Sequence, residues 1–267
     1  MRTWNADGTD KRERGTGGGG RSLQSELFAG LEWAALKASP VYYGFGVPHG
    51  DGAPVVLVPG FLGSDLSLLE LHLWLGRLGY RSHLSGIGVN AECPDALLAR
   101  LQDTVDRVYR ESGQRVTLIG HSLGGLLARA AAGRDPLKVK QVITLGTPSQ
   151  RLAAHPTVLR LLRHVLRRSY RSAKGRCLRS FGRGLRACLP ASVSVASICG
   201  RDDPVVGRRD CFDPNAARNI EVSGTHIGLP VNPAVYRELA QVLASPEQAP
   251  KVVTPQPASA VGLPLAA

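Results

Sequence analysis

The sequence predicts an α/β domain in which helices cover both faces of a mainly parallel sheet. Short apolar runs alternate along the chain with longer segments whose apolar residues recur at helical spacing, an alternation typical of parallel sheets. The run at 55–58 lacks the polar positions of a half-exposed strand, as expected where both faces of a sheet are buried. With 267 residues, 43% of them hydrophobic, the chain is long enough for one large domain.

The first expected strand, 55–58, is wholly apolar and is closed by the turn signal Pro59-Gly60. The later expected strands each contain Val, Ile or Leu together with polar residues. We expect these strands at 80–84, 116–119, 139–145, 193–199 and 219–222.

The helices are expected from apolar spacing and from their end signals. Ser67 and Glu70 form a capping box, and the helix that follows ends at Gly79. Pro94 begins another helix, which ends near Gly113, and Asn232 precedes the last one. We expect helices at 23–36, 67–79, 94–113, 123–132 and 233–243.

The two ends of the chain differ in composition from the rest. Residues 1–21 are charged and then glycine-rich, and residues 245–267 are rich in proline and alanine. We expect both to be disordered, with one domain at 22–244. Neither an apolar run of spanning length nor an N-terminal signal pattern is visible. We therefore expect a cytoplasmic location, with peripheral attachment to a membrane as an alternative.

The net charge of +12 has a local origin. No acidic residue occurs between Asp135 and Asp202, a stretch that holds 14 lysines and arginines. Such a segment indicates contact with an anionic surface, lipid or nucleic acid, or a solvated face that tolerates charge.

The five cysteines form no C-x-x-C pair, which argues against zinc-ribbon and thioredoxin-type proteins. Residues that could bind a metal are not clustered at metal-site spacing, and we expect no metal. One or two disulfides are compatible with the sequence. Cys177 and Cys188 bracket a short segment and could form one, or both could be free thiols.

Gly120-His121-Ser122-Leu123-Gly124 matches the pattern G-x-S-x-G. It directly follows the expected strand 116–119 and opens a helix rich in Ala and Leu. A sharp turn at this place would expose the hydroxyl of Ser122, and flanking glycines would avoid a clash in the crowded backbone. We interpret Ser122 as a nucleophile; an ordinary strand–helix turn is the alternative.

A serine nucleophile needs a histidine base. Of the seven histidines, His226 lies in the loop between the last strand and the last helix, at the edge where a parallel sheet presents functional side chains. His121 is adjacent to Ser122, and we expect it to be a packing residue. We therefore choose His226 as the base, with a loop histidine that makes only a local hydrogen bond as the alternative.

The histidine needs a carboxylate that orients it. Asp202 and Asp203 follow the strand 193–199 and would reach the same edge of the sheet. We choose Asp203 because the chain turns immediately after it, and Asp202 remains the local alternative.

Two backbone N–H groups are needed to stabilise the oxyanion of acyl transfer. Leu123, next to the nucleophile, is expected to supply one. Phe61, in the glycine-containing loop after the first strand, is expected to supply the other; a plain glycine turn is the alternative for this loop.

Taken in order, these motifs resemble the α/β-hydrolase superfamily and, within it, bacterial esterases and lipases. They are Pro-Gly-Phe-Leu-Gly, Gly-His-Ser-Leu-Gly-Gly, Asp-Pro-Val-Val and Gly-Thr-His-Ile-Gly-Leu, and the resemblance covers roughly residues 55–244. It implies a parallel-sheet hydrolase with a Ser122–His226–Asp203 triad, no cofactor, and an ester or lipid substrate cleaved through an acyl-enzyme. Acyltransferase or thioesterase activity on the same fold is the alternative.

The resemblance places an arginine-rich helical lid at about 149–190. One face of the expected helix is apolar, at 158, 161, 162, 165 and 166, and another carries Arg160, Arg163, His164, Arg167 and Arg171. This cationic amphipathic pattern suits an anionic membrane surface, although its apolar face could simply cover the acyl pocket. A polyanion-binding protein on an inactive scaffold is less well supported, because the basic segment has little aromatic interleaving; we expect no specific nucleic-acid partner. The oligomeric state is not predicted.

Overall fold

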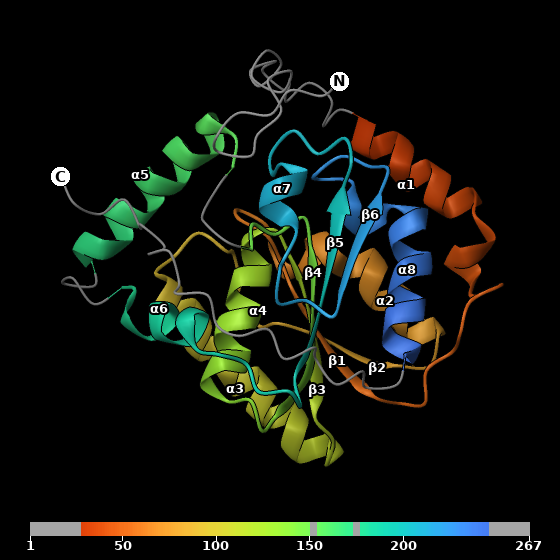
Figure 1. The fold of residues 1–267 in the computed structure, drawn as a ribbon, viewed down its shortest axis with the longest axis horizontal. Helices are drawn as coiled ribbons and strands as arrows, with labels where there is room; N and C mark the ends of the chain where they lie inside the picture. The colour runs from red at the N-terminus through yellow and green to blue at the C-terminus, as the bar shows by residue number, and fades with distance from the viewer. Residues whose placement is uncertain (1–27, 150–153, 173–176, 246–267) are drawn as a thin grey trace, which may run out of the picture.

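A six-stranded sheet forms the centre of the computed structural model, which describes residues 28–149, 154–172 and 177–245 (Figure 1). Its strand order is β2-β1-β3-β4-β5-β6, and all neighbouring strands are parallel. The predicted α/β architecture is therefore confirmed. The predicted disordered ends lie outside the described residues, except for Ser245.

The strands lie within two residues of their predicted positions. They are β1 (Pro54–Val58), β2 (Arg81–Leu84), β3 (Val116–His121), β4 (Val139–Leu145), β5 (Ser194–Gly200) and β6 (Arg218–Val222). Every residue of β1 is buried, because helices cover both faces of the sheet. Val55 and Leu57 pack on one face, and Val56 and Val58 pack on the other.

Two groups of helices form these two layers. The described helices are α1 (Ala29–Ala38), α2 (Leu69–Arg77), α3 (Pro94–Ser112), α4 (Leu123–Arg134), α5 (Pro156–Ser172), α6 (Arg179–Arg186), α7 (Arg208–Cys211) and α8 (Pro233–Ala244), with 3₁₀ turns η3 (Pro40–Tyr43), η4 (Asp65–Leu68) and η5 (Leu229–Val231). Side chains of α1, α2 and α8 pack on one face of the sheet, and those of α3, α4 and α6 pack on the other. None of the helices in the described part of the chain is long and apolar enough to cross a membrane.

Most of the predicted helix ends are found, but one is wrong. Pro94 begins α3, Gly113 follows it with a left-handed φ of 65°, and the Asn232 side chain accepts a hydrogen bond from the Ala234 amide at the start of α8. The capping box at Ser67 does not form. Ser67 lies within η4, where its hydroxyl donates to the Ser64 carbonyl, and α2 begins two residues later.

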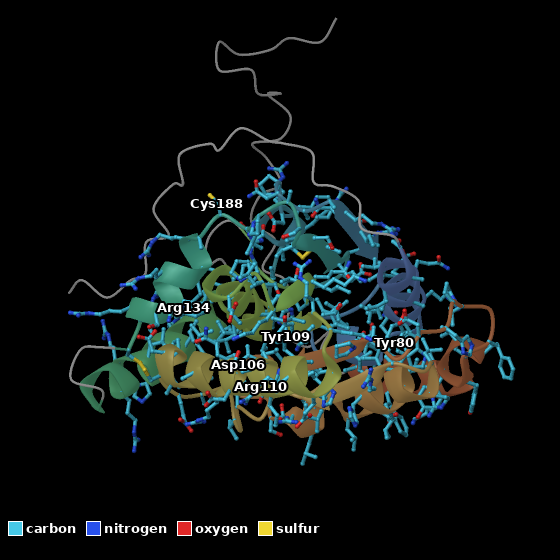
Figure 2. The ribbon with its side chains drawn as sticks, turned by 90° about the horizontal axis from the view of Figure 1, so that it is seen from below. Tyr80, Asp106, Tyr109, Arg110, Arg134 and Cys188 are labelled. Atoms are coloured by element: carbon cyan, nitrogen blue, oxygen red, sulfur yellow. A yellow bond between two sulfur atoms is a disulfide. The ribbon has the colours of Figure 1, made fainter. Side chains whose placement is uncertain are left out.

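Neither of the two alternatives for Cys177 and Cys188, a disulfide between them or two free thiols, is found. Cys177 pairs with Cys93, Cys199 pairs with Cys211, and Cys188 is free and exposed (Figure 2). The physical reason is packing: the segment before α6 lies against the start of α3, which brings the Cα atoms of Cys93 and Cys177 to 5.2 Å, a spacing that a disulfide can bridge. Cys188 lies beyond the other end of α6.

The predicted insertion at 149–190 contains two helices that differ in their packing. In α6, Phe181 is buried in the main core, and Gly184 lies so close to the Ala130 carbonyl of α4 that a β-carbon would collide with it. The carboxylate of Asp95 in α3 accepts hydrogen bonds from the first three amides of α6. The second half of the insertion is therefore fixed to the main domain.

Candidate active site

The strand order reverses at β1, whose neighbours are β2 on one side and β3 on the other. Chain segments leave the sheet in opposite directions at such a point, and a crevice opens at the carboxyl ends of the two strands. Phe61 follows β1 and Ser122 follows β3. The topology therefore explains why two predicted site residues from distant motifs lie near each other.

Ser122 occupies a strained backbone conformation between β3 and α4, with φ 52° and ψ −124°. A β-carbon at Gly120 would lie 2.5 Å from backbone atoms of Gly125, and one at Gly124 would collide with the Val58 carbonyl at the end of β1. The two glycines of the motif are thus required by close backbone approach, as the sequence indicated. A non-glycine residue with positive φ costs free energy, and such strain is often found at functional sites.

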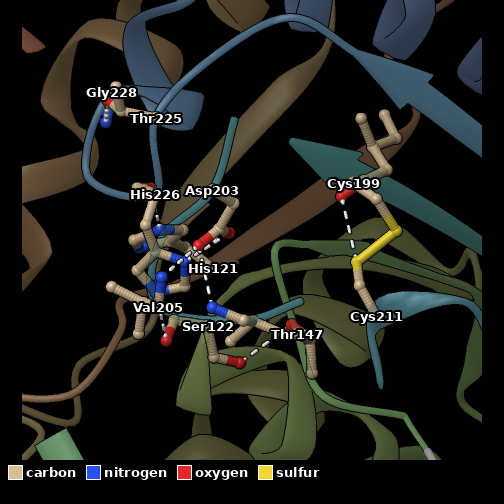
Figure 3. Close-up of polar contacts among 12 residues, drawn as sticks. His121, Ser122, Thr147, Cys199, Asp203, Val205, Cys211, Thr225, His226 and Gly228 are labelled. Carbon is tan, nitrogen blue, oxygen red and sulfur yellow. Dashed lines mark hydrogen bonds and ion pairs between the residues drawn. A yellow bond between two sulfur atoms is a disulfide. The ribbon is translucent and has the colours of Figure 1, made fainter. Parts of the chain in front are cut away.

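The structure brings Ser122, His226 and Asp203 into one hydrogen-bonded row (Figure 3). The Nδ1–H group of His226 donates to Asp203 Oδ2 at 2.7 Å, and His226 Nε2 accepts from the Ser122 hydroxyl at 2.9 Å. A carboxylate next to Nδ1 selects the tautomer in which Nε2 is unprotonated and can act as a base.

Asp203 is held by the turn that the sequence indicated. Its Oδ1 atom accepts hydrogen bonds from the amides of Val205 and Val206, both at 2.8 Å, which leaves Oδ2 for His226. Asp203 is 1% exposed, whereas the alternative residue, Asp202, is exposed to solvent. Backbone donors stabilise the ionised carboxylate in this buried position.

His121, which we expected to be a packing residue, also makes a hydrogen bond to the backbone of His226. Its Nε2–H group donates to the backbone carbonyl of His226 at 2.9 Å, and the two rings lie 5.1 Å apart. Burial, together with the nearby His226 ring, lowers the pKa of His121 to about 3. His121 is therefore neutral at ordinary pH and fixes the backbone position of His226 without adding a positive charge.

The two predicted oxyanion donors flank the nucleophile. A β-carbon at Gly60, which precedes Phe61, would lie 3.1 Å from Ser122 Cβ, so this loop runs beside the serine. Leu123 begins α4, where the first amides have no carbonyl partner within the helix. Among the described residues, the backbone hydrogen bonds of turns, loops and helix caps include none in which the amide of Phe61 or Leu123 is the donor.

Asn90 holds the loop that carries Phe61, a role that the sequence did not indicate. Its side-chain amide donates to the Pro59 carbonyl at 2.8 Å, its backbone N–H donates to the Gly63 carbonyl, and its carbonyl accepts from Leu62, each at 2.9 Å. Asn90 is 0% exposed. No local pattern marks this residue, because the contacts join segments about 30 positions apart in the chain.

A mainly apolar pocket extends from Phe61 and Leu123 between four helices. Leucines of α3 and α4 line one side, and Leu162 and Leu166 of α5 and Phe181 of α6 line the other. Two charged side chains also line it, and each has a partner: Arg129 pairs with Asp213, and Glu92 pairs with Arg100. The pocket is therefore suited to an uncharged, apolar group, and it reaches Leu123, the residue that follows Ser122.

Comparison with known proteins agrees with this architecture. A family model described as the alpha/beta hydrolase fold matches residues 99–180, which include Ser122. The chain has the α/β-hydrolase fold.

Two curated relatives of this chain are triacylglycerol lipases. That of Burkholderia plantarii is 32% identical over 130 residues, which are 45% of this chain and 36% of the relative. That of Pseudarthrobacter phenanthrenivorans is 34% identical over 105 residues, which are 36% of this chain and 33% of the relative. The chain matches only about a third of the length of these proteins, so the homology to bacterial lipases is distant.

Solved structures resemble the fold over most of the chain. A metagenomic carboxyl esterase superposes with a TM-score of 0.56 at 15% identity, covering 84% of this chain and 91% of that one. The propeptide form of a Bacillus licheniformis lipase superposes with a TM-score of 0.54 at 16% identity, covering 78% and 54%. At such low identity these similarities establish the fold alone.

Proposed function

We propose that this protein is a serine hydrolase that cleaves carboxylic esters through an acyl-enzyme. The observation that carries the proposal is the position of His226, which is hydrogen-bonded to Ser122 on one side and to Asp203 on the other. The distant homology to bacterial triacylglycerol lipases supports the same reaction class.

In the first half-reaction, Ser122 Oγ attacks the ester carbonyl while His226 Nε2 takes the hydroxyl proton. Asp203 stabilises the imidazolium that results, since its carboxylate contacts Nδ1 at 2.7 Å. The amides of Phe61 and Leu123 stabilise the oxyanion. His226 then protonates the leaving alcohol, and in the second half-reaction it activates a water molecule that releases the acid from Ser122.

The apolar pocket supports an ester with an apolar acyl chain as the substrate. The pocket begins at the two expected oxyanion donors and is lined mostly by apolar side chains, so the carbonyl can lie at Ser122 while the chain extends between the helices. In this proposal α5 and α6 act as the cover of the acyl pocket.

The decisive experiment replaces Ser122 by Ala and measures hydrolysis of a nitrophenyl ester. Removal of the nucleophile is expected to lower kcat by several orders of magnitude, up to about 10⁶-fold, without unfolding the protein. Ser112→Ala, at the end of α3 and away from the pocket, is the control and should retain activity. Turnover by folded Ser122→Ala near that of the wild type would disprove the proposal.

The same assay separates hydrolysis from acyl transfer. A burst of nitrophenol reports the acyl-enzyme, which esterases, thioesterases and acyltransferases share. Added alcohols or thiols then compete with water for the acyl group. An unchanged yield of free acid supports the hydrolase, and diversion of most acyl groups to the added acceptor supports an acyltransferase.

We also propose that the basic face of α5 attracts the enzyme to anionic lipid surfaces. Arg160, Arg163 and Arg167 are exposed, while Leu162 and Leu166 on the same helix are buried at the pocket. This arrangement would keep the arginines in water near lipid headgroups and the pocket beside them. The side chain of Arg171 lies outside the described residues.

The two disulfides support an oxidising compartment for the enzyme. Structural disulfides persist where thiols are not kept reduced, and both Cys93–Cys177 and Cys199–Cys211 join separate elements of the domain. We therefore propose an oxidising compartment for the enzyme instead of the cytoplasmic location expected from the sequence.

A further inference from the structure

The loop that carries His226 is joined to the N-terminal helix by a carboxylate. Glu32 in α1 accepts a hydrogen bond from the Thr225 amide at 3.0 Å and from the Thr225 hydroxyl at 2.6 Å. It also accepts from the Asn232 side chain at 2.9 Å. Thr225 directly precedes His226, and Asn232 begins the helix that follows the loop. One side chain therefore contacts the loop at both of its ends.

The two glycines of the loop leave room for this carboxylate. A β-carbon at Gly224 would lie 2.8 Å from Glu32 Oε1, and one at Gly228 would collide with Glu32 Oε2. Figure 3 shows Thr225 and Gly228 together on the turn that carries His226. The motif Gly-Thr-His-Ile-Gly is thus shaped around a residue 193 positions away from Thr225.

Other bonds in the loop converge on the same threonine. The Gly228 amide donates to the Thr225 hydroxyl at 3.2 Å, and the Leu229 amide donates to the Thr225 carbonyl at 3.1 Å. Thr225 is 6% exposed and Glu32 is half-buried, so the bonds between them are partly sheltered from water. Hydrogen bonds to an ionised carboxylate are stronger than neutral ones, and Glu32 receives three of them.

We propose that Glu32 is a positioning residue for His226, an inference that rests on the proposed ester hydrolysis. Glu32 fixes Thr225, and Thr225 sets the backbone from which the imidazole reaches Ser122 and Asp203. The 2.9 Å contact between His226 Nε2 and Ser122 Oγ leaves little tolerance, because displacement of a catalytic group by about 1 Å can cost up to about 100-fold in rate. His121 supports the same backbone from the other side through the His226 carbonyl.

A second carboxylate provides a matched control. Glu70 in α2 accepts hydrogen bonds from Lys37 Nζ at 2.7 Å, the Tyr42 hydroxyl at 2.8 Å and Trp33 Nε1 at 3.2 Å. It therefore also receives three donors and also holds the N-terminal segment to the domain, but it makes no hydrogen bond to the loop of His226 in the described residues. Glu70→Gln reports the effect of loosening that segment alone.

The test compares Glu32→Gln and Glu70→Gln by ester kinetics and by amide hydrogen exchange of residues 223–232. We expect Glu32→Gln to lower kcat about 10- to 100-fold, to change KM less than about two-fold, and to speed exchange in the loop. Glu70→Gln should leave kcat and the loop unchanged even if it lowers the melting temperature. An unchanged kcat in folded Glu32→Gln, or an equal fall in both variants, would overturn the proposal.

Thr225 provides a second route if Glu32→Gln does not fold. Thr225→Ser keeps the hydroxyl and should retain kcat, whereas Thr225→Val should lower it as Glu32→Gln does; equal activity of the two Thr225 variants would overturn the proposal. A fluorophosphonate probe applied to the wild type tests the serine nucleophile separately. If the wild type is not labelled, the ester-hydrolase proposal fails, and unchanged loop exchange in Glu32→Gln would then also overturn the structural link.

Discussion

The carboxyl edge of the sheet and the outer face of α5 represent two different ways in which this chain places polar groups. At the edge, Asp203 is buried and receives two backbone N–H groups besides His226. On α5, Arg160 and Arg163 extend into solvent from a helix that contacts the domain through Leu162 and Leu166. The first arrangement holds the carboxylate through directed hydrogen bonds, and the second presents charge at the surface.

This difference indicates which substitutions should alter the chemistry and which should alter only the surface. A buried polar group with directed partners is costly to disturb, because its loss leaves the partners unsatisfied. An exposed charge contributes little to folding and acts mainly through its electrostatic field. Expected effects should therefore decrease from the carboxyl edge, through α6, to the outer face of α5.

The largest effect in this comparison should come from Asp203→Asn. The amide side chain cannot stabilise an imidazolium and favours the wrong histidine tautomer, so we expect kcat to fall by about 10⁴-fold. Asp202→Asn, one residue away and exposed, should change kcat less than about two-fold. Side-by-side kinetics at one pH decide the matter, and the reverse ranking would reassign the acid to Asp202.

A smaller effect, on stability, should separate two glycines of α6. A β-carbon at Gly184 would collide with the Ala130 carbonyl of α4, whereas one at Gly182 would meet only the end of the Arg186 side chain at 3.2 Å. We expect Gly184→Ala to lower the free energy of unfolding by about 1–3 kcal/mol, because the backbones must separate. Gly182→Ala should be neutral or stabilising by up to about 1 kcal/mol.

Denaturant unfolding of both variants is the measurement. If Gly184→Ala were as stable as the wild type, α6 would not be fixed to α4. Substitutions in α6 would then affect stability as little as substitutions on the outer face of α5. Equal destabilisation by both substitutions would instead indicate that any side chain in this helix is poorly tolerated.

The sequence predicted those parts of the site that depend on local backbone geometry. Gly120 and Gly124 mark the sharp turn at Ser122, and the positions of the strands along the chain follow from short runs rich in apolar residues. The same reasoning could not find Glu32, Asn90 or the Cys93–Cys177 pair. Each of these acts on a segment far away in the chain, and no periodicity links such positions before the fold brings them together.

The arginine-rich segment illustrates the opposite limit. Its composition predicted a single lid. Composition alone does not tell which of the helices in this segment packs against the main domain. Gly184 fixes α6 through close backbone approach, and Phe181 fixes it through burial. In the sequence, these two residues are surrounded by arginines and do not stand out. The charge pattern is informative about a surface, and the small and aromatic residues are informative about packing.

The smallest effect on soluble-ester hydrolysis should follow from removing the charges of α5. The variant replaces Arg160, Arg163, Arg167 and Arg171 with Gln. None of them belongs to the hydrogen-bonded row at Ser122, so kcat on a short soluble ester should stay within about two-fold. Binding to anionic vesicles should weaken, since each basic residue near an anionic membrane contributes about 1 kcal/mol.

A second four-residue variant separates position from net charge. Arg81, Arg107, Arg110 and Arg237 are exposed on other elements, and Figure 2 labels Arg110 on α3; their replacement with Gln removes the same four charges. Co-sedimentation with anionic and neutral vesicles, repeated as salt shortens the Debye length to about 8 Å and below, compares the two variants with the wild type. Stronger loss in the α5 variant, confined to anionic vesicles and low salt, would place the lipid-binding surface on α5. Equal loss in both variants would show that vesicle binding depends on net charge alone. The arginines of α5 would then have no special part in lipid binding, and α5 would serve only to cover the pocket.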